Sequence, residues 1–236
     1  MQTDKDLCQK QIDLLKQDLE EFAYIVSHDL KAPVRAISNL SSWIEEDLGE
    51  DLPAEVMHNM QLLRNRAARM EKMIEALLQY SRVQRYDLAT GTIDVNQLMQ
   101  QLQEHTFSAY PLQVNIPKPL PVLQTYTSKI QTVFEQLLLN AIIFGQKPVT
   151  QISVTATKAD GFYEFCVADN GCGVPQEALD KIFTLFYTVA PKDSVDTVGA
   201  GLAITKKIIQ FVGATIKAEQ NKTGGLTIRF TWPEKV

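Results

Sequence analysis

The sequence predicts an α plus α/β protein in which a long helical hairpin, paired into a dimeric four-helix bundle, precedes an α/β-sandwich domain. Up to about residue 88, apolar residues alternate four and three apart, which is the seam spacing of a coiled coil. After residue 94, short alternating strands are mixed with helices. The 236 residues are enough for two modest cores. We therefore place the hairpin at 1–88, a hinge at 89–93 and the second domain at 94–236.

Composition and charge exclude several classes of protein. The net charge of −5 and the lack of a basic run argue against a nucleic-acid partner. No apolar stretch is long enough to span a bilayer, so we expect no membrane segment in this chain. The three cysteines, Cys8, Cys166 and Cys172, show no metal-ligand spacing and no framework of bridges, which favours a reducing cytoplasmic setting.

The first helix is predicted from Asp4 to Leu48, with Gly49 as its stop. His28 should project from it, because residues next to the seam point about 100° per step away from it. Asp29 follows at once, and Pro33 removes a backbone donor and loosens the helix. An exposed imidazole beside a carboxylate is a plausible phosphate acceptor, although a lone histidine is more often an ordinary surface or core residue. The seam residues are Cys8, Ile12, Leu15, Leu19, Phe22 and Val26.

The second helix is predicted to follow a short turn, with Pro53 at a first-turn position. Its apolar residues again alternate four and three apart, so two long helices form an antiparallel hairpin. One hairpin cannot cover two apolar stripes of this length. We therefore expect a second copy of the chain to pair with it and cover them. The stripe of the second helix consists of Val56, Met60, Leu63, Ala67, Met70, Ile74, Leu77 and Ser81.

The second domain is predicted to mix helices and strands without strict alternation. Asp94 should cap its first helix. This pattern favours a sandwich with the helices on one face of a mixed sheet. The expected helices lie at 95–107, 128–144, 176–183 and 201–211. The expected strands lie at 112–116, 151–157, 162–168, 215–218 and 226–232.

Three features of this domain suggest a nucleotide site. The run Asp169-Asn-Gly-Cys-Gly173 follows a strand, and its glycines either let a ligand come close to the backbone or merely form a tight turn. The run Val198-Gly-Ala-Gly-Leu202 opens into a helix, an arrangement that cradles phosphates in many nucleotide sites. Asn140 is a polar amide in an apolar helix, so it is either hydrogen-bonded within the core or an oxygen ligand for a hard cation such as Mg²⁺.

Together these runs resemble the conserved boxes of sensor histidine kinases, in the family's order and across 19–233. The resemblance is closest to the soluble, phytochrome-associated branch. It implies an ATP-binding domain of the gyrase, heat-shock chaperone and histidine kinase type. The run from Ser27 to Pro33 is similar to the phosphoacceptor box, that from Gln131 to Phe144 to the Asn box, 169–173 to the first glycine box, 183–187 to the Phe box, and 199–203 to the second glycine box.

This resemblance implies the site residues and the cofactors. Asp169 would accept a hydrogen bond from the adenine amino group of ATP, and Asn140 would help to hold Mg²⁺. The loop from Tyr187 to Val198 would be a lid. The hinge would bring the γ-phosphate to Nε2 of His28, while Asp29 fixes the tautomer of the imidazole and takes up its proton. The implied ATP-binding residues are Asn140, Asp169, Gly171, Gly173, Tyr187, Lys192, Gly199, Gly201 and Leu202.

The resemblance also implies partners. A second copy of the chain completes the bundle as a homodimer. The phosphoryl group passes to an aspartate on the receiver domain of a response regulator, which would dock near Arg35 to Trp43. We expect the signal to come from an upstream sensory domain or a separate sensor protein.

Four residues depart from the family pattern. Ile143 replaces a phosphate-binding lysine of the Asn box, whose charge Lys147 or Lys192 could supply, and Gln136 and Thr197 replace an asparagine and a glycine. Ala32 replaces the Thr or Asn that orients a water, which predicts weak or absent phosphatase activity. Two other readings therefore stay open: a catalytically weak scaffold or phosphorelay module that gates a partner, and an ATP-driven clamp that needs no histidine.

Overall fold

A computed structural model describes residues 2–49, 53–189, 197–221 and 224–236. The side chains of residues 2–6, 8, 9, 13 and 16 lie outside that description, and so does the predicted seam position of Cys8. The chain divides into two compact units, Met1–Arg82 and Val83–Val236. We describe each unit by itself.

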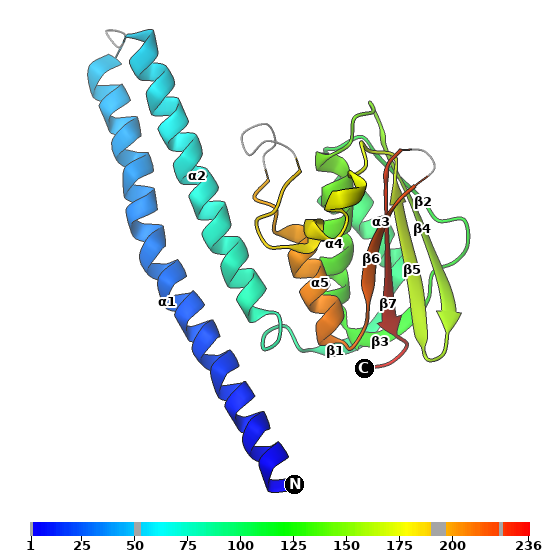
Figure 1. The fold of residues 1–236 in the computed structure, drawn as a ribbon. Coiled ribbons are helices and arrows are strands. Elements are labelled where there is room, and N and C mark those ends of the chain that lie inside the picture. The colour runs from blue at the N-terminus through cyan, green and yellow to red at the C-terminus, as the bar shows by residue number, and fades with distance from the viewer. Residues whose placement is uncertain (1, 50–52, 190–196, 222–223) are drawn as a thin grey trace. The chain divides into compact units, whose positions relative to one another are not determined.

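The first unit is an antiparallel helical hairpin (Figure 1). Its helices are α1 (Gln2–Leu48) and α2 (Ala54–Arg82), as the apolar periodicity predicts. Gly49 follows α1 with a φ of 55°, which confirms the predicted glycine stop. The helix runs unbroken through Pro33. Because proline has no N–H, the carbonyl of Asp29, one turn earlier, loses its usual helical donor.

The interface between the two helices contains a small buried apolar cluster, which consists of Val34, Ala67 and Ile74. The ion pairs Lys31–Glu75 and Arg35–Glu71, at 3.3 and 2.8 Å, join the helices along their edges. By contrast, the largest apolar side chains of the predicted seam are exposed in the single chain: Leu15 by 68%, Leu19 by 62% and Phe22 by 65%.

Ser27 lies in this interface with 1% of its surface exposed, and its hydroxyl has no hydrogen-bond partner in the described part of the chain. A buried hydroxyl without a partner lowers stability by about 1–3 kcal/mol. We therefore expect Ser27→Ala to keep or raise the urea midpoint of the protein at fixed concentration. Ser81→Ala is the matched control, because the buried Ser81 hydroxyl donates to the Leu78 carbonyl at 2.8 Å, and it should lower the midpoint. A lower midpoint for Ser27→Ala would show that the hydroxyl has a partner in the assembled protein.

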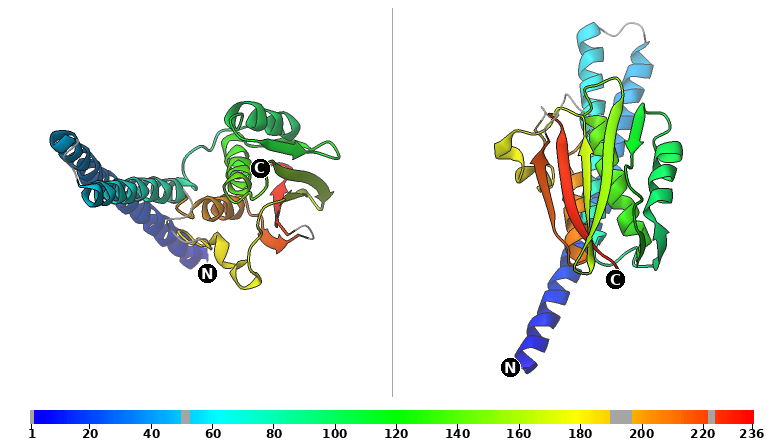
Figure 2. Two further views of the ribbon diagram at one scale, coloured as in Figure 1. Left: turned by 90° about the horizontal axis from the view of Figure 1, so that it is seen from above. Right: turned by 90° about the vertical axis from the view of Figure 1, so that its right-hand side faces the viewer.

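The second unit is an α/β sandwich (Figure 2). Its main sheet has the order β2-β4-β5-β7-β6, with β2 parallel to β4 and the other neighbours antiparallel. Helices α4 (Thr127–Ile143) and α5 (Gly201–Phe211) lie side by side on one face of it, which confirms the predicted sandwich on a mixed sheet. The strands are β2 (Leu112–Asn115), β4 (Thr150–Ala159), β5 (Phe162–Asp169), β6 (Ile216–Gln220) and β7 (Leu226–Pro233).

The core of the sandwich is aromatic. Phe134 of α4 meets Phe165 of β5 and Phe230 of β7 with ring centroids 5.6 and 5.8 Å apart. The rings of Phe165 and Phe230 stack at 5.1 Å across the paired strands. These contacts join α4 to the sheet. The helix that carries Asn140 is therefore held firmly against the strand that ends in Asp169.

A second, two-stranded sheet is absent from the sequence prediction. Strand β1 (Thr90–Asp94) pairs antiparallel with β3 (Val122–Tyr126). Most of the segment predicted as a hinge, 89–93, is therefore strand. The Thr90-Gly91 pair resembles a breaker when it is read locally, but pairing with a strand some 30 residues later satisfies its backbone. Turns and irregular structure occupy 83–89 instead.

The shorter helices differ in detail from their predictions. Asp94 caps α3 (Val95–Gln101) as predicted, and its carboxylate accepts from the Asn96 backbone N–H at 2.8 Å. The helix then widens into a π-helical turn, η2 (Leu102–Thr106). The helix expected at 176–183 is wrong as one element. It is two 3₁₀ turns, η3 (Gln176–Ala178) and η4 (Lys181–Phe183).

None of the helices in the described ranges is long and apolar enough to cross a membrane.

Candidate functional site

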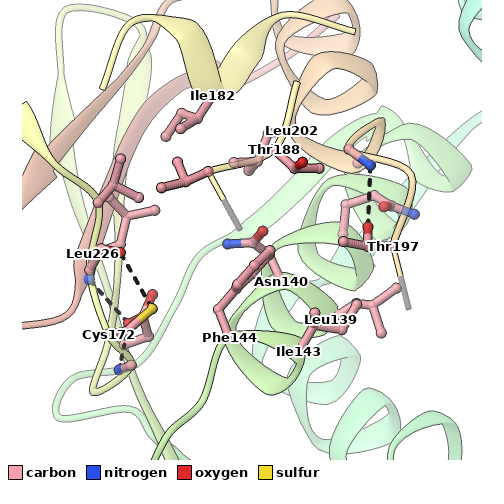
Figure 3. Close-up of a pocket in the computed structure, with 18 of the residues that line it drawn as sticks. Leu139, Asn140, Ile143, Phe144, Cys172, Ile182, Thr188, Thr197, Leu202 and Leu226 are labelled. Carbon is pink, nitrogen blue, oxygen red and sulfur yellow. Dashed lines mark hydrogen bonds between the residues drawn. The ribbon is translucent and has the colours of Figure 1, made fainter. Parts of the chain in front are cut away.

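A cavity of about 210 Å³ opens in the second unit between α4, the turn after β5 and the start of α5 (Figure 3). Its lining brings together eight of the nine predicted ATP-binding residues, although they come from distant parts of the sequence. The ninth, Lys192, lies outside the described residues. The eight are Asn140, Asp169, Gly171, Gly173, Tyr187, Gly199, Gly201 and Leu202.

Asn140 projects from α4 into the middle of this cavity (Figure 3). Of the two alternatives for this amide, the cavity wall fits the ligand role better than a buried core bond. The described residues contain no cluster of three His, Cys, Asp or Glu side chains that could hold a metal ion. Mg²⁺ accepts such a site when substrate phosphates and water supply the other oxygens, so Asn140 fits it as one ligand among several.

Asp169, the last residue of β5, is held in place by backbone donors. Its Oδ1 accepts hydrogen bonds from the N–H groups of Gly171 and Leu226, at 2.8 and 3.1 Å. Within the described chain these bonds leave Oδ2 as the oxygen for a ligand. Burial raises the pKa of Asp169, and the bonds from Leu226 and Gly171 act in the opposite direction.

Two residues that the sequence did not single out position Asp169. The side-chain amide of Asn221 donates to the Asp169 carbonyl at 2.7 Å and accepts from the Gly225 N–H at 2.9 Å. A Cβ on Gly225 would collide with the carbonyl oxygen of Asp169. Both residues lie in the turn before β7. By sequence this turn looks like any Gly-Gly turn, and no local signal links it to a residue more than 50 positions earlier.

The glycines of the two boxes are required by close backbone contacts. Gly173 has a φ of 69°, and a Cβ there would meet the carbonyl oxygen of Gly224. Gly199 has a φ of 72°, and a Cβ would meet the carbonyl oxygen of Tyr187. Since other residues rarely adopt this φ and no space exists for a side chain, the glycine boxes are packing requirements as well as signs of ligand binding.

The structure gives the departure at Thr197 a local role. Its Oγ1 accepts a hydrogen bond from the Gly199 N–H at 3.3 Å (Figure 3). The carbonyl of Gly199 accepts from the Phe186 N–H at 2.8 Å, which joins the second glycine box to the Phe box. Thr197 therefore replaces a flexible glycine with a side chain that helps to hold the loop.

In the described residues, backbone N–H groups and an amide side chain form the part of the cavity suited to phosphates. Helix α5 begins at Gly201 without a side-chain cap, so its first N–H groups are available to an anion. Gln136 lines the cavity beside Gly201. Lys147, one of the two cations considered for the phosphates, is not among the described lining residues of this cavity. It borders a separate hollow on the sheet with Gln113 and Gln151.

Apolar side chains that sequence reasoning passed over complete the cavity. Ile143 stands where the family pattern has a phosphate-binding lysine. It contributes to this apolar wall and supplies no charge. Such a wall suits a planar base better than a phosphate chain. The further apolar lining residues are Leu139, Phe144, Val174, Ile182, Val189 and Leu226.

In the first unit, His28 is exposed as predicted, by 75% of its side chain. Its Nδ1 lies 3.1 Å from Oδ1 of Asp29, which is itself 71% exposed. An ionised carboxylate only accepts hydrogen bonds, so the ring nitrogen donates and carries the proton. In the neutral form of this tautomer the other ring nitrogen, Nε2, keeps its lone pair.

An exposed histidine–aspartate pair on a helical hairpin, joined to a sandwich with a glycine-lined cavity, defines the class of two-domain histidine kinase cores. The His Kinase A (phospho-acceptor) domain family matches residues 18–85. The histidine kinase-, DNA gyrase B- and HSP90-like ATPase family matches residues 125–236. The chain belongs to the sensor histidine kinases and carries both of their catalytic-core domains.

The relatives by sequence are phytochromes and sensor kinases, as the predicted branch implies. Cyanobacterial phytochrome B of Nostoc sp. is 32% identical over 98% of this chain and 32% of its own length. Adaptive-response sensory kinase SasA of Nostoc sp. is 27% identical over 87% of this chain and 55% of its own. The chain thus spans about a third of the phytochromes it matches.

Solved histidine kinases share the fold. Full-length ShkA in complex with AMPPNP superposes with a TM-score of 0.64 at 21% identity, over 92% of this chain and 46% of ShkA. The histidine kinase ThkA, in complex with the response regulator protein TrrA, gives a TM-score of 0.64 at 19% identity, over 98% of this chain and 67% of that one. At these identities the likeness establishes the fold and not the ligands.

Proposed function

We propose that this chain is the catalytic core of an ATP-dependent protein-histidine kinase, which phosphorylates His28 and transfers the phosphoryl group to an aspartate of a response regulator. One observation carries the proposal. All the predicted ATP-binding residues that are described line a single cavity, while the predicted acceptor presents a free Nε2 beside a carboxylate. Neither feature is expected from packing alone.

The cavity supports a specific placement of ATP. Oδ2 of Asp169 accepts from the adenine amino group, and the apolar wall around Ile143 covers the base. The phosphates lie toward the first N–H groups of α5, where the helix dipole favours negative charge. Asn140, with phosphate oxygens and water, would hold Mg²⁺, which neutralises phosphate charge. The loop from Tyr187 to Val198, including Lys192, remains the proposed lid.

The chemistry at His28 follows from its tautomer. Asp29 holds the proton on Nδ1, so the Nε2 lone pair attacks the γ-phosphorus in line. A bond forms between Nε2 and phosphorus as the bond to the bridging oxygen breaks, and ADP leaves. Asp29 stabilises the positive charge that develops on the ring and takes up the Nδ1 proton. The irregular segment 83–89, which precedes β1, is proposed as the hinge that lets the second domain reach His28.

The hairpin supports the homodimer. Its buried apolar cluster contains three residues, whereas Leu15, Leu19 and Phe22 are at least 62% exposed. Pairing with a second copy would cover these side chains and complete the four-helix bundle.

The response regulator would dock around Arg35 to Trp43, where Arg35, Leu40 and Trp43 are exposed. The same proposal includes three further points. The signal comes from an upstream sensory domain or sensor protein, and the setting is cytoplasmic. Phosphatase activity is weak, as Ala32 predicts.

Incubation with γ-labelled ATP and Mg²⁺ tests the proposal. We expect wild-type protein to gain acid-labile, base-stable label, as a phosphohistidine does, and His28→Gln to gain none. His58→Gln, on α2, is the matched control and should keep the label, because this histidine has no place in the site.

The alternative functions give different results. A catalytically weak scaffold or relay would bind ATP without labelling itself and would accept a phosphoryl group only from a partner. An ATP-driven clamp would hydrolyse ATP at the same rate in wild type and His28→Gln. Either result would refute the kinase assignment.

A further inference from the structure

The pair of His28 and Asp29 is too weak to orient the imidazole by itself. Both side chains are more than 70% exposed, and the ring nitrogen and the carboxylate oxygen are 3.1 Å apart. Exposed pairs of this kind are screened by salt and contribute little to conformational preference. If Asp29 acted alone, the ring of His28 would exchange among rotamers and would hold no single direction for Nε2.

A second contact restrains the same ring. Tyr24 lies one helical turn before His28 on α1, and their rings stack with centroids 6.3 Å apart and an interplanar angle of 29°. Residues four apart on a helix are neighbours, so the contact requires no unusual backbone. The ring of Tyr24 therefore lies beside the imidazole and restricts its rotation.

Tyr24 is itself held from the other helix. The guanidinium carbon of Arg82, at the end of α2, lies 5.4 Å from the centre of the Tyr24 ring, a cation–π distance. Tyr24 is about half exposed, so packing in a core does not explain its position. These two contacts connect Arg82, the last residue of the hairpin, through the ring of Tyr24 to the ring of His28.

We propose that Tyr24 is a positioning residue for the phosphoacceptor, which holds the His28 imidazole in the orientation that keeps Nδ1 on Asp29 and Nε2 free for attack. This inference rests on the proposed function. It adds that kinase turnover depends on an aromatic side chain of α1 that stacks on the acceptor ring. The hydroxyl of Tyr24 has no part in it, since the stacking contact involves only the ring.

The first test measures the tautomer of His28 by ¹⁵N NMR of the imidazole and needs no kinase activity. In the unphosphorylated wild-type protein at a pH where the ring is neutral, we expect the Nδ1–H form to dominate. In Tyr24→Leu the balance should shift toward the Nε2–H form that unrestrained histidine prefers, and in Tyr24→Phe it should stay as in wild type. An ordinary tautomer mixture in wild type would overturn the proposal, even if a variant failed to fold.

The second test measures autophosphorylation kinetics with ATP. Tyr24→Leu should lower kcat roughly tenfold and leave KM for ATP within about twofold, because misplacing a reacting group slows the chemical step and not the binding of ATP. Tyr24→Phe should retain wild-type kcat within about threefold. Tyr110→Leu removes a tyrosine of similar exposure from the second domain and should change neither value. Unchanged kcat in Tyr24→Leu would overturn the proposal, whereas absent labelling of wild type would instead count against the kinase assignment.

Discussion

Asp169→Asn is expected to weaken ATP binding roughly 100-fold, because a hydrogen bond to a charged group contributes about 1.5–3 kcal/mol. Asparagine keeps an oxygen for the Gly171 and Leu226 N–H groups, so the turn after β5 should survive. It replaces the ligand-facing oxygen with an NH₂ group, which opposes the adenine amino group donor to donor. Titration calorimetry with ATP and Mg²⁺ measures the change.

The control for this variant is Asp180→Asn. Asp180 is exposed and is not among the described residues that line the cavity, so its loss should leave affinity within about twofold. If Asp169→Asn binds ATP as tightly as wild type, the proposed contact to adenine is wrong. A parallel measurement with GTP, which has a carbonyl in place of the amino group, should show weak binding to wild type and a smaller relative loss in the variant.

The affinity should also depend on pH in a direction fixed by Asp169. Burial raises the pKa of this carboxyl, and the adenine amino group needs its ionised form. ATP affinity should therefore fall as the pH is lowered through that raised pKa, at a higher pH than for an ordinary aspartate. In the ligand-free protein, the raised pKa means that burial disfavours the ionised form of Asp169 relative to the unfolded chain. The contribution of Asp169 to the free energy of unfolding therefore becomes more favourable as the pH falls. Asp169→Asn should remove this part of the pH dependence.

Gly225→Ala is expected to weaken ATP binding about as much as Asp169→Asn, although Gly225 carries no side chain to contact a nucleotide. Its Cβ would collide with the Asp169 carbonyl and approach Oδ1 at 2.6 Å, and these atoms belong to backbone and to a fixed carboxylate. Relief requires moving either the end of β5 or the turn that Asn221 braces. Because a hydrogen bond weakens steeply when its distance and angle change, either displacement should remove most of the contribution of Asp169 to ATP binding. Calorimetry and near-ultraviolet circular dichroism follow the two effects.

Gly161→Ala is the matched control for Gly225→Ala. Gly161 has a φ of 81° in the β4–β5 turn, but a Cβ there meets nothing within 4 Å. It should lower stability by about 1 kcal/mol through backbone strain and leave ATP affinity unchanged. Equal loss of binding in the two variants would mean that general destabilisation, and not the position of Asp169, is responsible.

Much of the fold could be predicted because its signals are local. Apolar spacing predicted α1 and α2, and Gly49 and Asp94 marked a helix end and a helix start as their chemistry requires. Strands β1 and β3 were missed, because each is only five residues long and becomes a strand only through the other. The 176–183 segment carries helical residues but forms two separate 3₁₀ turns.

The candidate site divides in the same way. The residue types at His28, Asn140, Asp169 and the glycine boxes indicated their chemistry, because few side chains can accept a phosphoryl group, ligate Mg²⁺ or leave room for a phosphate. Asn221 and Gly225 carried no such signal. They act on Asp169 through backbone contacts that exist only once β7 lies beside β5.

The sequence by itself determined the kind of protein, the order of its domains and the residues able to do chemistry, since these follow from side-chain type and local periodicity. Only the tertiary structure decided which of them share a cavity and that Asn221 braces Asp169. It alone set the Arg82 guanidinium over the ring of Tyr24. The physical reason is distance. Contacts between residues far apart in the chain depend on the packing of whole helices and strands, which no short run of residues encodes.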